Sequence, residues 1–228
     1  MNKNIILIPY RKRKEHLKYF IENTVPKLIE KIDNLEILIV KQCNGKKFNR
    51  GKLMNVGYKY YDNSNNFYIT QDVDINPIHN SSLTQYNRNV GDCILRIFSS
   101  KFDTLGGIIK FKGSTFEKIN GFTNNYWGWG LEDRNLRNRA RYYGINILTY
   151  MLDKCKTRNL YFKEFDDVKD RTPLNNKQLR KLNYKLFNLM SKEKRLEYIY
   201  ESGLNNLEYK ILKEKRINEY IKKITVEI

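Results

Sequence analysis

Apolar positions in the first part of the chain form short continuous runs that alternate with helical repeats. The runs at 4–9, 35–41 and 67–70 predict buried β-strands. Between them, apolar residues recur at the spacing of a helix face within 15–32 and 50–60. Alternation of strand and helix is typical of an α/β fold built on a mostly parallel sheet.

The rest of the chain carries a weaker pattern that extends the same domain. Strands are predicted at 105–111 and 224–228, a helix at 177–200 and a turn at 203–206, and the polar stretch 153–176 is interpreted as a loop. The sequence contains no internal repeat and no convincing second domain. We therefore predict one domain for the whole chain.

Composition narrows the class of protein. The chain has 228 residues, 40% of them hydrophobic, which suits one domain with a sizeable core. No run reaches the roughly 20 apolar residues of a membrane span. The sequence opens almost directly in a predicted strand, which leaves no room for a signal peptide, and its three cysteines are an odd number. These features predict a soluble or cytoplasmic protein with reduced thiols.

The formal net charge of +18 allows two interpretations. A basic surface can attract nucleic acid or anionic membranes non-specifically. However, no nucleic-acid-binding motif accompanies the charge, and half of the excess, +9, lies within 154–223, away from the first four of the motifs described below. We therefore interpret the charge as a solvated surface and expect no specific nucleic-acid partner.

Charged residues directly follow two of the predicted strands. Arg11 and Arg13 come after the first strand, and Asp72 and Asp74 come after the third. Ligands of parallel α/β sheets bind outside the carboxyl ends of the strands, so these side chains can face one crevice. Guanidinium groups hold phosphate oxygens through paired hydrogen bonds, and carboxylates hold hard divalent cations. The pattern indicates a site for a metal ion and a diphosphate.

The segment 121–139, GFTNNYWGWGLEDRNLRNR, combines residue types that suit a sugar-binding catalytic turn. Its glycines let the backbone approach a ligand closely, and Trp127 and Trp129 offer flat apolar faces that suit sugar rings. Glu132 and Asp133 stand at the start of a predicted helix, where the dipole favours an ionised carboxylate that can accept a proton. The same position also fits a helix-capping role.

Five motifs, in order, resemble the β1,4-galactosyltransferase family. They are IILIPYRKRKEHLKYF from residue 5, FNRGKLMNVGY from residue 48, QDVDINP from residue 71, WGWGLED from residue 127 and the ending from residue 201. The resemblance implies a glycosyltransferase A-type fold with a Rossmann-like central sheet flanked by helices. It also implies a single domain, 1–228, in which 1–110 mainly binds the nucleotide sugar and 111–228 mainly forms the acceptor site and catalytic loop.

The resemblance implies a role for each matching residue. The donor would be held by residues from four of the motifs: Pro9, Arg11, Arg13, Phe48, Asn49, Arg50, Asp72, Val73, Asp74 and Trp129. The acceptor would be held by the turn after the second tryptophan: Gly130, Leu131, Glu132, Asp133 and Arg134. Asp133 is the expected general base, and Glu132 would position the acceptor or the loop. Asp74 with Asp72 would bind the metal ion, and Glu164 is a further candidate ligand.

The implied activity is the inverting transfer of galactose from UDP-galactose to a carbohydrate acceptor, which forms a β-linkage. Mn²⁺ is the implied cofactor, with Mg²⁺ as a substitute. The sequence departs from the family pattern at the catalytic turn, where Leu131 and Arg134 replace a glycine and an acid. We therefore expect an acceptor other than terminal N-acetylglucosamine.

Two further departures concern the metal ion and the donor. The family completes its metal site with a downstream histidine, whereas this chain offers Glu164, Asp166 and Asp167 in that region. Thr104 stands where the family has a tyrosine that disfavours N-acetyl groups, so UDP-N-acetylgalactosamine is a second expected donor. These departures leave an alternative open, namely a catalytically weak protein that binds a sugar nucleotide or a glycan and retains the fold.

Overall fold

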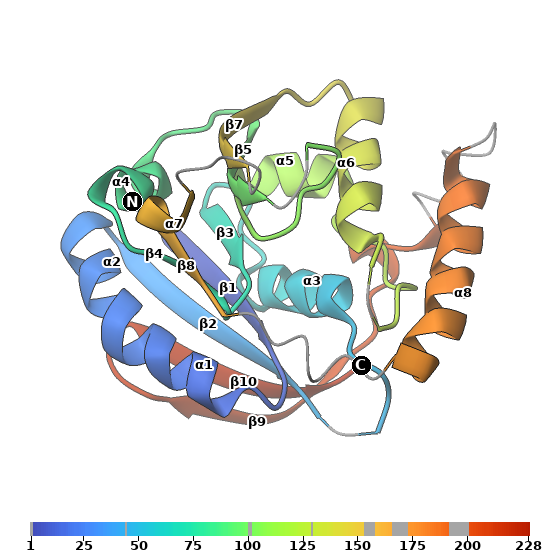
Figure 1. Cartoon of the computed structure of the whole chain (residues 1–228), viewed down its shortest axis with the longest axis horizontal. Coiled ribbons are helices and arrows are strands. Elements are labelled where there is room, and N and C mark those ends of the chain that lie inside the picture. Colours follow the sequence, from blue (N-terminus) through green and yellow to red (C-terminus); the bar gives the residue numbers. More distant parts are fainter. Residues whose placement is uncertain are drawn as a thin grey trace.

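The computed structural model describes residues 2–43, 45–99, 102–128, 130–152, 158–165, 173–191 and 201–228 (Figure 1). Its central feature is an eight-stranded sheet with the strand order β7-β5-β6-β3-β1-β2-β10-β9. The strands are β1 (Asn4–Tyr10), β2 (Leu35–Gln42), β3 (Phe67–Gln71), β5 (Ile94–Ser99), β6 (Ile108–Lys112), β7 (Ile147–Leu152), β9 (Lys210–Arg216) and β10 (Ile221–Glu227).

The predicted mostly parallel α/β sheet is confirmed. The β1–β2, β1–β3, β2–β10 and β5–β7 pairs are parallel. The strands β6 and β9 run antiparallel to their neighbours. Because β1, β2 and β3 are parallel, the segments that follow them emerge at the same edge of the sheet.

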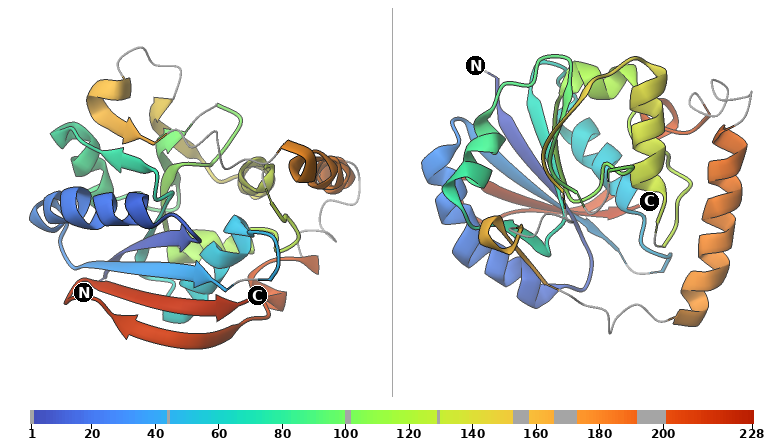
Figure 2. Two further views of the ribbon diagram at one scale, coloured as in Figure 1. Left: turned by 60° about the horizontal axis from the view of Figure 1, so that its bottom comes forward. Right: turned by 45° about the horizontal axis from the view of Figure 1, so that its top comes forward.

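The central strands are buried on both faces of the sheet, and alternate residues of each strand point to opposite sides. In β1, Ile5 and Leu7 belong to one apolar core, and Ile6 and Ile8 belong to the other. Figure 2 shows helices on the two sides of the sheet. The first core is closed by α3 (Arg50–Tyr61), α5 (Gly113–Lys118) and α6 (Glu132–Tyr142), and the second by α1 (Lys14–Tyr19), α2 (Val25–Lys31) and α4 (Asn80–Asn87).

The elements predicted within the first 71 residues are all present, with small shifts of their ends. The helix predicted at 15–32 consists of α1, a π-helical segment at Phe20–Thr24 and α2. The predicted final strand is β10, and the predicted strand at 105–111 begins later, as β6. The strands β5, β7 and β9 were not predicted. Of these, β9 is exposed along its whole length, so it carries no buried apolar run.

The interpretation of 153–176 as a plain loop was wrong for its described part. This part contains α7 (Arg158–Tyr161) and the short strand β8 (Phe162–Glu164), and α8 (Pro173–Ser191) begins before its end. The strand β8 pairs antiparallel with β4 (Ile75–Pro77), which follows the Asp72–Asp74 segment. Such short strands form through long-range pairing, which a local apolar pattern does not encode.

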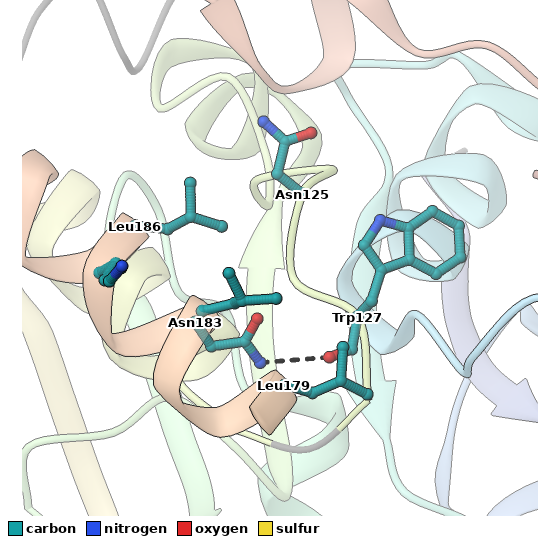
Figure 3. A pocket seen from close by; sticks show the side chains of 7 residues that line it. Asn125, Trp127, Leu179, Asn183 and Leu186 are labelled. Atoms are coloured by element: carbon teal, nitrogen blue, oxygen red, sulfur yellow. Dashed lines mark hydrogen bonds between the residues drawn. The ribbon is translucent and has the colours of Figure 1, made fainter. Parts of the chain in front are cut away.

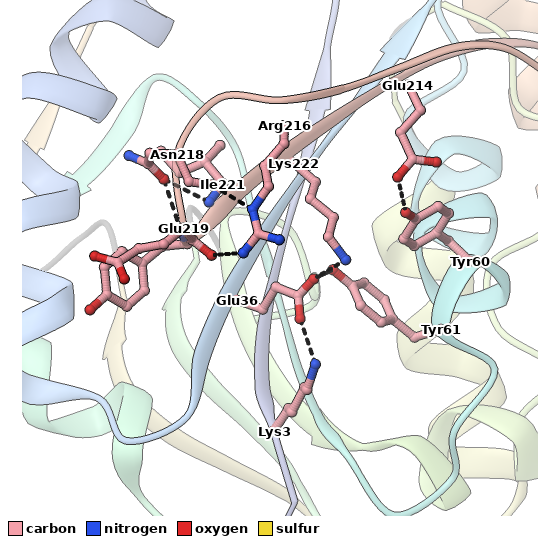
Figure 4. Close-up of polar contacts among 11 residues, drawn as sticks. Lys3, Glu36, Tyr60, Tyr61, Glu214, Arg216, Asn218, Glu219, Ile221 and Lys222 are labelled. Carbon is pink, nitrogen blue, oxygen red and sulfur yellow. Dashed lines mark hydrogen bonds and ion pairs between the residues drawn. The ribbon is translucent and has the colours of Figure 1, made fainter.

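Glu36 on β2 joins several elements through polar contacts (Figure 4). Its carboxylate accepts hydrogen bonds from Lys3 at 2.8 Å, Tyr61 at 2.7 Å and Lys222 at 2.8 Å. Burial by itself would raise the pKa of Glu36, but hydrogen bonds from Lys222 and Lys3 lower it to about 2. The carboxylate therefore stays ionised and links β2 to β10 and to the end of α3.

The helix α8 lies apart from the sheet, beside α6 in Figures 1 and 2. Asn183 of α8 nevertheless contacts the loop that precedes α6. Within the described ranges, no helix has both the length and the apolar character needed to cross a bilayer.

Candidate active site

The carboxylates of Asp72 and Asp74 lie just after β3, at the edge of the sheet where the sequence analysis expected them. Asp74 accepts a hydrogen bond from Nη1 of Arg13 at 2.9 Å. Burial and the charge of Asp72 raise the pKa of Asp74, and the charge of Arg13 opposes them. The arginine that follows the first strand and the carboxylate that follows the third therefore meet, as predicted.

Arg50 connects these carboxylates to the catalytic turn. It begins α3, is only 9% exposed and donates from Nε to Oδ1 of Asp72 at 2.6 Å. Burial alone would lower its pKa, but the charge of Asp72, followed by those of Glu132 and Asp133, raises it. Its Nη1 and Nη2 atoms are buried and have no hydrogen-bond partner among the described residues. Buried polar groups without a partner are rare, so these nitrogens indicate a place for an anionic ligand.

Glu132 and Asp133 begin α6, as the helix-start pattern predicted. Burial and the charge of Asp133 raise the pKa of Glu132 to about 7, and the charge of Arg50 opposes them. Burial also raises the pKa of Asp133, again opposed by Arg50. Oδ1 of Asp133 accepts a hydrogen bond from the backbone N–H of Arg134 at 2.7 Å. A carboxylate pair that takes up a proton near neutral pH is suited to general acid–base chemistry.

A turn at Gly106 and Gly107 holds the two carboxylate segments together. The backbone N–H of Asp72 donates to the carbonyl of Gly107, and the N–H of Leu105 donates to the carbonyl of Asp133, both at 3.2 Å. Gly106 lies so close to Asp133 that an added Cβ would stand 2.7 Å from Oδ2. The charge of Asp72 also raises the pKa of Asp133. The two acidic segments, far apart in sequence, therefore form one site.

The glycine-rich loop before α6 is held from two sides, and Figure 3 shows the side that faces α8. Nδ2 of Asn183 on α8 donates to the carbonyls of Trp127 and Gly130, each at 3.2 Å. On the other side, the backbone N–H of Gly128 donates to the carbonyl of Phe48 at 2.7 Å. A cavity of about 270 Å³ lies between this loop and the apolar side chains of α8.

The backbone turns sharply at Gly130 and Leu131, which have φ angles of +102° and +80°. A left-handed leucine is strained by about 1–2 kcal/mol, whereas glycine adopts this region freely. The side chain of Leu131 is 6% exposed, and its burial offsets part of the strain. Trp129, which the sequence analysis assigned to the donor, lies outside the described residues.

Arg11 and Phe48 lie next to each other, although 37 positions separate them in the sequence. The guanidinium of Arg11 stands 5.4 Å from the centroid of the Phe48 ring and donates to the carbonyl of Lys46 at 2.7 Å. Burial lowers the pKa of Arg11. The pair combines a cation with an aromatic face, which suits a nucleotide.

Three other predicted donor residues are buried within the fold. Asn49 is fully buried, and its side chain accepts from the N–H of Lys52 and donates to the carbonyl of Asn124. It therefore caps α3 and anchors the loop before the tryptophans. Pro9 and Val73 are buried as well.

Comparison with known proteins identifies the family. Residues 1–87 match the family profile described as the N-terminal region of glycosyl transferase group 7, and residues 95–163 match the one described as the N-terminal domain of galactosyltransferase. The whole chain is 31% identical to bovine β-1,4-galactosyltransferase 1, of which it covers 54%. It is 29% identical to β-1,4-galactosyltransferase 7 of Drosophila melanogaster, over 93% of this chain and 64% of that protein. The chain belongs to the β1,4-galactosyltransferase family.

Solved structures agree with this assignment. A mutant of Drosophila β1,4-galactosyltransferase 7, in complex with manganese, UDP-Gal and xylobiose, superposes with a TM-score of 0.78 at 25% identity, covering 99% of this chain and 94% of that one. A mannosyltransferase from Pyrobaculum calidifontis, in complex with GDP-Man and Mn²⁺, shares the fold with a TM-score of 0.56 and 10% identity. The predicted glycosyltransferase A-type fold is thereby confirmed.

The two carboxylates of the Asp72–Asp74 segment are suitable ligands for a hard divalent cation. Asp72 and Asp74 provide carboxylate oxygens, and the repulsion between them, expressed in the raised pKa of Asp74, would be relieved by a cation. Pairing of Ile75 with Glu164 and the hydrogen bond from the N–H of Phe165 to the carbonyl of Asp74 bring the candidate ligand Glu164 alongside. No cluster of three potential ligands is preassembled among the described residues. The other candidates, Asp166 and Asp167, lie outside the described ranges.

The family motif is supported by one buried residue that the sequence analysis did not single out. Arg139 of α6 is 1% exposed, and its guanidinium donates to six oxygens, those of Asn135, Ile119, Asn120, Gly121, Thr123 and Ser202. Four of these acceptors are backbone carbonyls, whose positions no motif reveals. Arg139 thus fixes α6, and with it the catalytic pair, to the segment that leads into the tryptophans.

Proposed function

We propose that this chain is a UDP-galactose-dependent transferase that moves galactose to a hydroxyl group of a carbohydrate acceptor with inversion at the anomeric carbon. The observation that carries the proposal is the position of Arg50, which pairs with Asp72 while responding to the charges of Glu132 and Asp133. This arrangement brings the acids suited to a metal-bound diphosphate close to the acids suited to proton transfer. The family relationship supports the choice of galactose and of UDP.

In the reaction, the acceptor hydroxyl oxygen attacks the anomeric carbon of galactose on the face opposite UDP. The carboxylate of Asp133 takes the hydroxyl proton, and the bond between the sugar and UDP breaks with its electrons moving to the diphosphate. An α-linked donor therefore yields a β-glycoside. Glu132, which lies next to the base, positions the acceptor.

The departing diphosphate needs positive charge around it. Hydrogen bonds to its oxygens come from Arg13 and from Nη1 and Nη2 of Arg50, which have no partner among the described residues. Arg11 with Phe48 holds the nucleoside end. Mn²⁺, or Mg²⁺, held by Asp74 and Asp72 with Glu164 as a candidate third ligand, would act as a Lewis acid toward the leaving group. Residues 1–110 thus mainly bind the donor, and 111–228 mainly provide the acceptor site and the base.

We assign UDP-N-acetylgalactosamine as a second donor. Thr104 is buried and its hydroxyl lies 2.7 Å from that of Ser99, so a small side chain occupies the position where the family carries tyrosine. Rates of UDP release from UDP-galactose and UDP-N-acetylgalactosamine are the test. A strict preference for UDP-galactose would rule out the second donor.

The function is tested by a panel of UDP-sugars, measured with and without Mn²⁺ for binding and for UDP release. Turnover should require the metal ion and should collapse by at least about a hundredfold in Asp133→Asn, while donor binding persists. Loss of binding would instead indicate a misfolded variant. Donor binding with no turnover in the unmodified chain would identify a sugar-nucleotide-binding protein and overturn the enzyme assignment.

A further inference from the structure

Three arginines converge beside the catalytic turn: Arg134, which is a predicted acceptor residue, and Arg96 and Arg137, which have no role in the chemistry described so far. Arg96 on β5 is 1% exposed, and its guanidinium carbon lies 5.3 Å from the ring centroid of Phe102. Arg137 on α6 approaches the same ring at 5.6 Å. Arg134, one turn earlier on α6, pairs with Asp103 at 2.8 Å. The ring of Phe102 is 66% exposed, so the cluster has an aromatic surface open to solvent.

The charges of this cluster are not balanced within the described protein. Nε and Nη1 of Arg96 and Nε of Arg137 are buried and have no hydrogen-bond partner among the described residues. Burial and the neighbouring charge of Arg137 lower the pKa of Arg96, and Asp103 only partly opposes them. The nearby carboxylates are Asp103, which pairs with Arg134, and Asp133, whose pKa the charge of Arg134 helps to lower. Neither gives the buried Nε and Nη1 atoms of Arg96 a hydrogen bond.

A purely structural buried arginine looks different in this protein. Arg139 lies on α6 and is as buried as Arg96, but its guanidinium donates to six oxygen acceptors of the protein. Desolvating a guanidinium without such partners costs several kcal/mol, so the unpaired nitrogens of Arg96 call for an acceptor from outside the chain. A carboxylate, sulfate or phosphate group matches their geometry, because it accepts parallel hydrogen bonds from a guanidinium.

The cluster is close to the base that would receive the acceptor proton. Arg137 follows Asp133 by four residues, which puts both side chains on the same face of α6, about 6 Å apart along the axis. Arg96 shares its side of β5 with Ile94, which packs in the core closed by α6. The strand and the helix therefore present their arginines to one place, next to Asp133.

We propose that Arg96, Arg134 and Arg137 form an anion subsite that binds a carboxylate, sulfate or phosphate group of the acceptor. The inference rests on the proposed transferase function and specifies its acceptor class as an acidic saccharide. The exposed ring of Phe102 packs against the apolar face of the acidic sugar, and the guanidinium groups of Arg96 and Arg137 hold its charge. At Arg134 the chain carries a cation where the family has an acid, and this departure also favours an acceptor with a negative charge.

The test uses the full chain with Mn²⁺ and UDP-galactose and a set of aryl glycosides that differ in one group. The set comprises a neutral glucoside, the corresponding glucuronide, and the glucoside 6-sulfate and 6-phosphate. The value of kcat/KM should be at least about tenfold higher for one acidic acceptor than for the neutral one. Which acid is preferred distinguishes a carboxylate from a sulfate or phosphate ester.

Substitutions test whether these arginines cause the preference for an acidic acceptor. In Arg137→Gln the ratio of acidic to neutral kcat/KM should fall toward one, and Arg96→Met should act in the same direction. Arg141→Gln is the matched control, since Arg141 is an exposed arginine one turn further along α6, and it should leave the ratio unchanged. Thermal melting checks that each variant folds, and Arg137→Gln decides the test if Arg96→Met does not fold. A ratio near one in the unmodified chain, or a preference that survives both substitutions, would overturn the proposal.

Binding measured without turnover separates this inference from the function on which it rests. Calorimetric titration of the aryl glucuronide and glucoside 6-sulfate, in the presence of UDP and Mn²⁺, should show binding that Arg137→Gln weakens and Arg141→Gln does not. If this result appears without galactose transfer to any acceptor, the subsite stands and the transferase function fails. If transfer proceeds equally to neutral and acidic acceptors, the function stands and the subsite fails.

Discussion

The contact between Gly106 and Asp133 offers a direct test of how the catalytic acid is positioned. Replacing Gly106 by alanine would put a methyl group 2.7 Å from Oδ2 of Asp133 and 3.5 Å from its Cβ. The backbone of Gly106 does not need the left-handed region, so alanine is acceptable there in itself. The steric conflict is therefore confined to the carboxylate that we propose as the base.

The expected loss of rate follows from the distance by which the methyl group displaces the carboxylate of Asp133. Ordinary van der Waals contact begins near 3.4 Å, so the oxygen of Asp133 must withdraw by about 0.7 Å. Misplacement of a reacting group by about 1 Å costs on the order of a hundredfold in rate. We expect Gly106→Ala to lower kcat by about 10- to 100-fold. Stability should stay within about 1 kcal/mol, because loss of a glycine also restricts the unfolded chain.

The adjacent glycine supplies the control. Gly107 has a φ of +78°, and an added Cβ would lie 2.7 Å from the backbone oxygen of Phe98, which cannot move away as a side chain does. Gly107→Ala should therefore lower the melting temperature, whereas Gly106→Ala should not. Steady-state kinetics of galactose transfer, together with thermal unfolding of both variants, makes the comparison. A Gly106→Ala variant with unchanged kcat, or with the same loss of stability as Gly107→Ala, would refute the proposed positioning of Asp133.

Three further predictions concern the carboxylates and the loop. Glu132 has a pKa of about 7, and the pKa of its neighbour Asp133, the proposed base, is raised as well, so this buried pair takes up a proton as pH falls below neutral. The value of kcat/KM should therefore rise with pH up to about 7 and then level off, and a flat profile between pH 5.5 and 8 would contradict the acid–base role of the pair. The pKa of Glu36, lowered from 4.5 to about 2, should contribute about 3 kcal/mol of stability that is present above pH 4.5 and lost as pH falls through 2. Urea unfolding of Glu36→Gln against the unmodified chain should accordingly give a difference that shrinks between pH 5 and 2, and a constant difference would disprove it. Asn183→Ala, which removes the hydrogen bonds to Trp127 and Gly130, should raise the acceptor KM severalfold and speed amide exchange in that loop; unchanged exchange would show that α8 does not restrain it.

The sequence predicted the strands on which the donor site is built because both faces of the sheet are covered. A strand buried on both faces is a continuous apolar run, as in 4–9 and 35–41, and such runs are recognisable without any knowledge of partners. The three-residue strands β4 and β8 carry no such signal, because each exists only through pairing with the other. The same pairing decides where Glu164 lies, so its position beside Asp74 was beyond reach of the sequence.

The candidate site also contains residues that the sequence could predict and residues that it could not. Asp72, Asp74 and the Glu132–Asp133 pair could be predicted because their residue types follow directly from the chemistry they would perform. Gly106 and Arg139 could not, since their importance comes from a contact across the fold and from backbone carbonyls of distant segments. Asn49 belongs to a predicted donor motif, yet its buried hydrogen bonds give it a capping and anchoring position. A motif therefore identifies the neighbourhood of a site better than it identifies which side chains touch the ligand.

The hydrogen bonds of the buried arginines help to decide which side chains bind a ligand, which the motifs alone do not. The guanidinium of Arg139 donates to protein oxygens on all sides, so its hydrogen bonds are made whether or not a ligand is bound. Arg50 donates from Nε to Asp72 but leaves Nη1 and Nη2 without a partner among the described residues, and Arg96 likewise has two buried nitrogens without one. Buried donor groups without a partner lower the stability of the free protein, and a ligand anion that accepts their hydrogen bonds recovers this energy as affinity. By this reasoning the donor diphosphate belongs at Arg50 and the acceptor's acidic group at Arg96, on either side of the carboxylate that takes the proton.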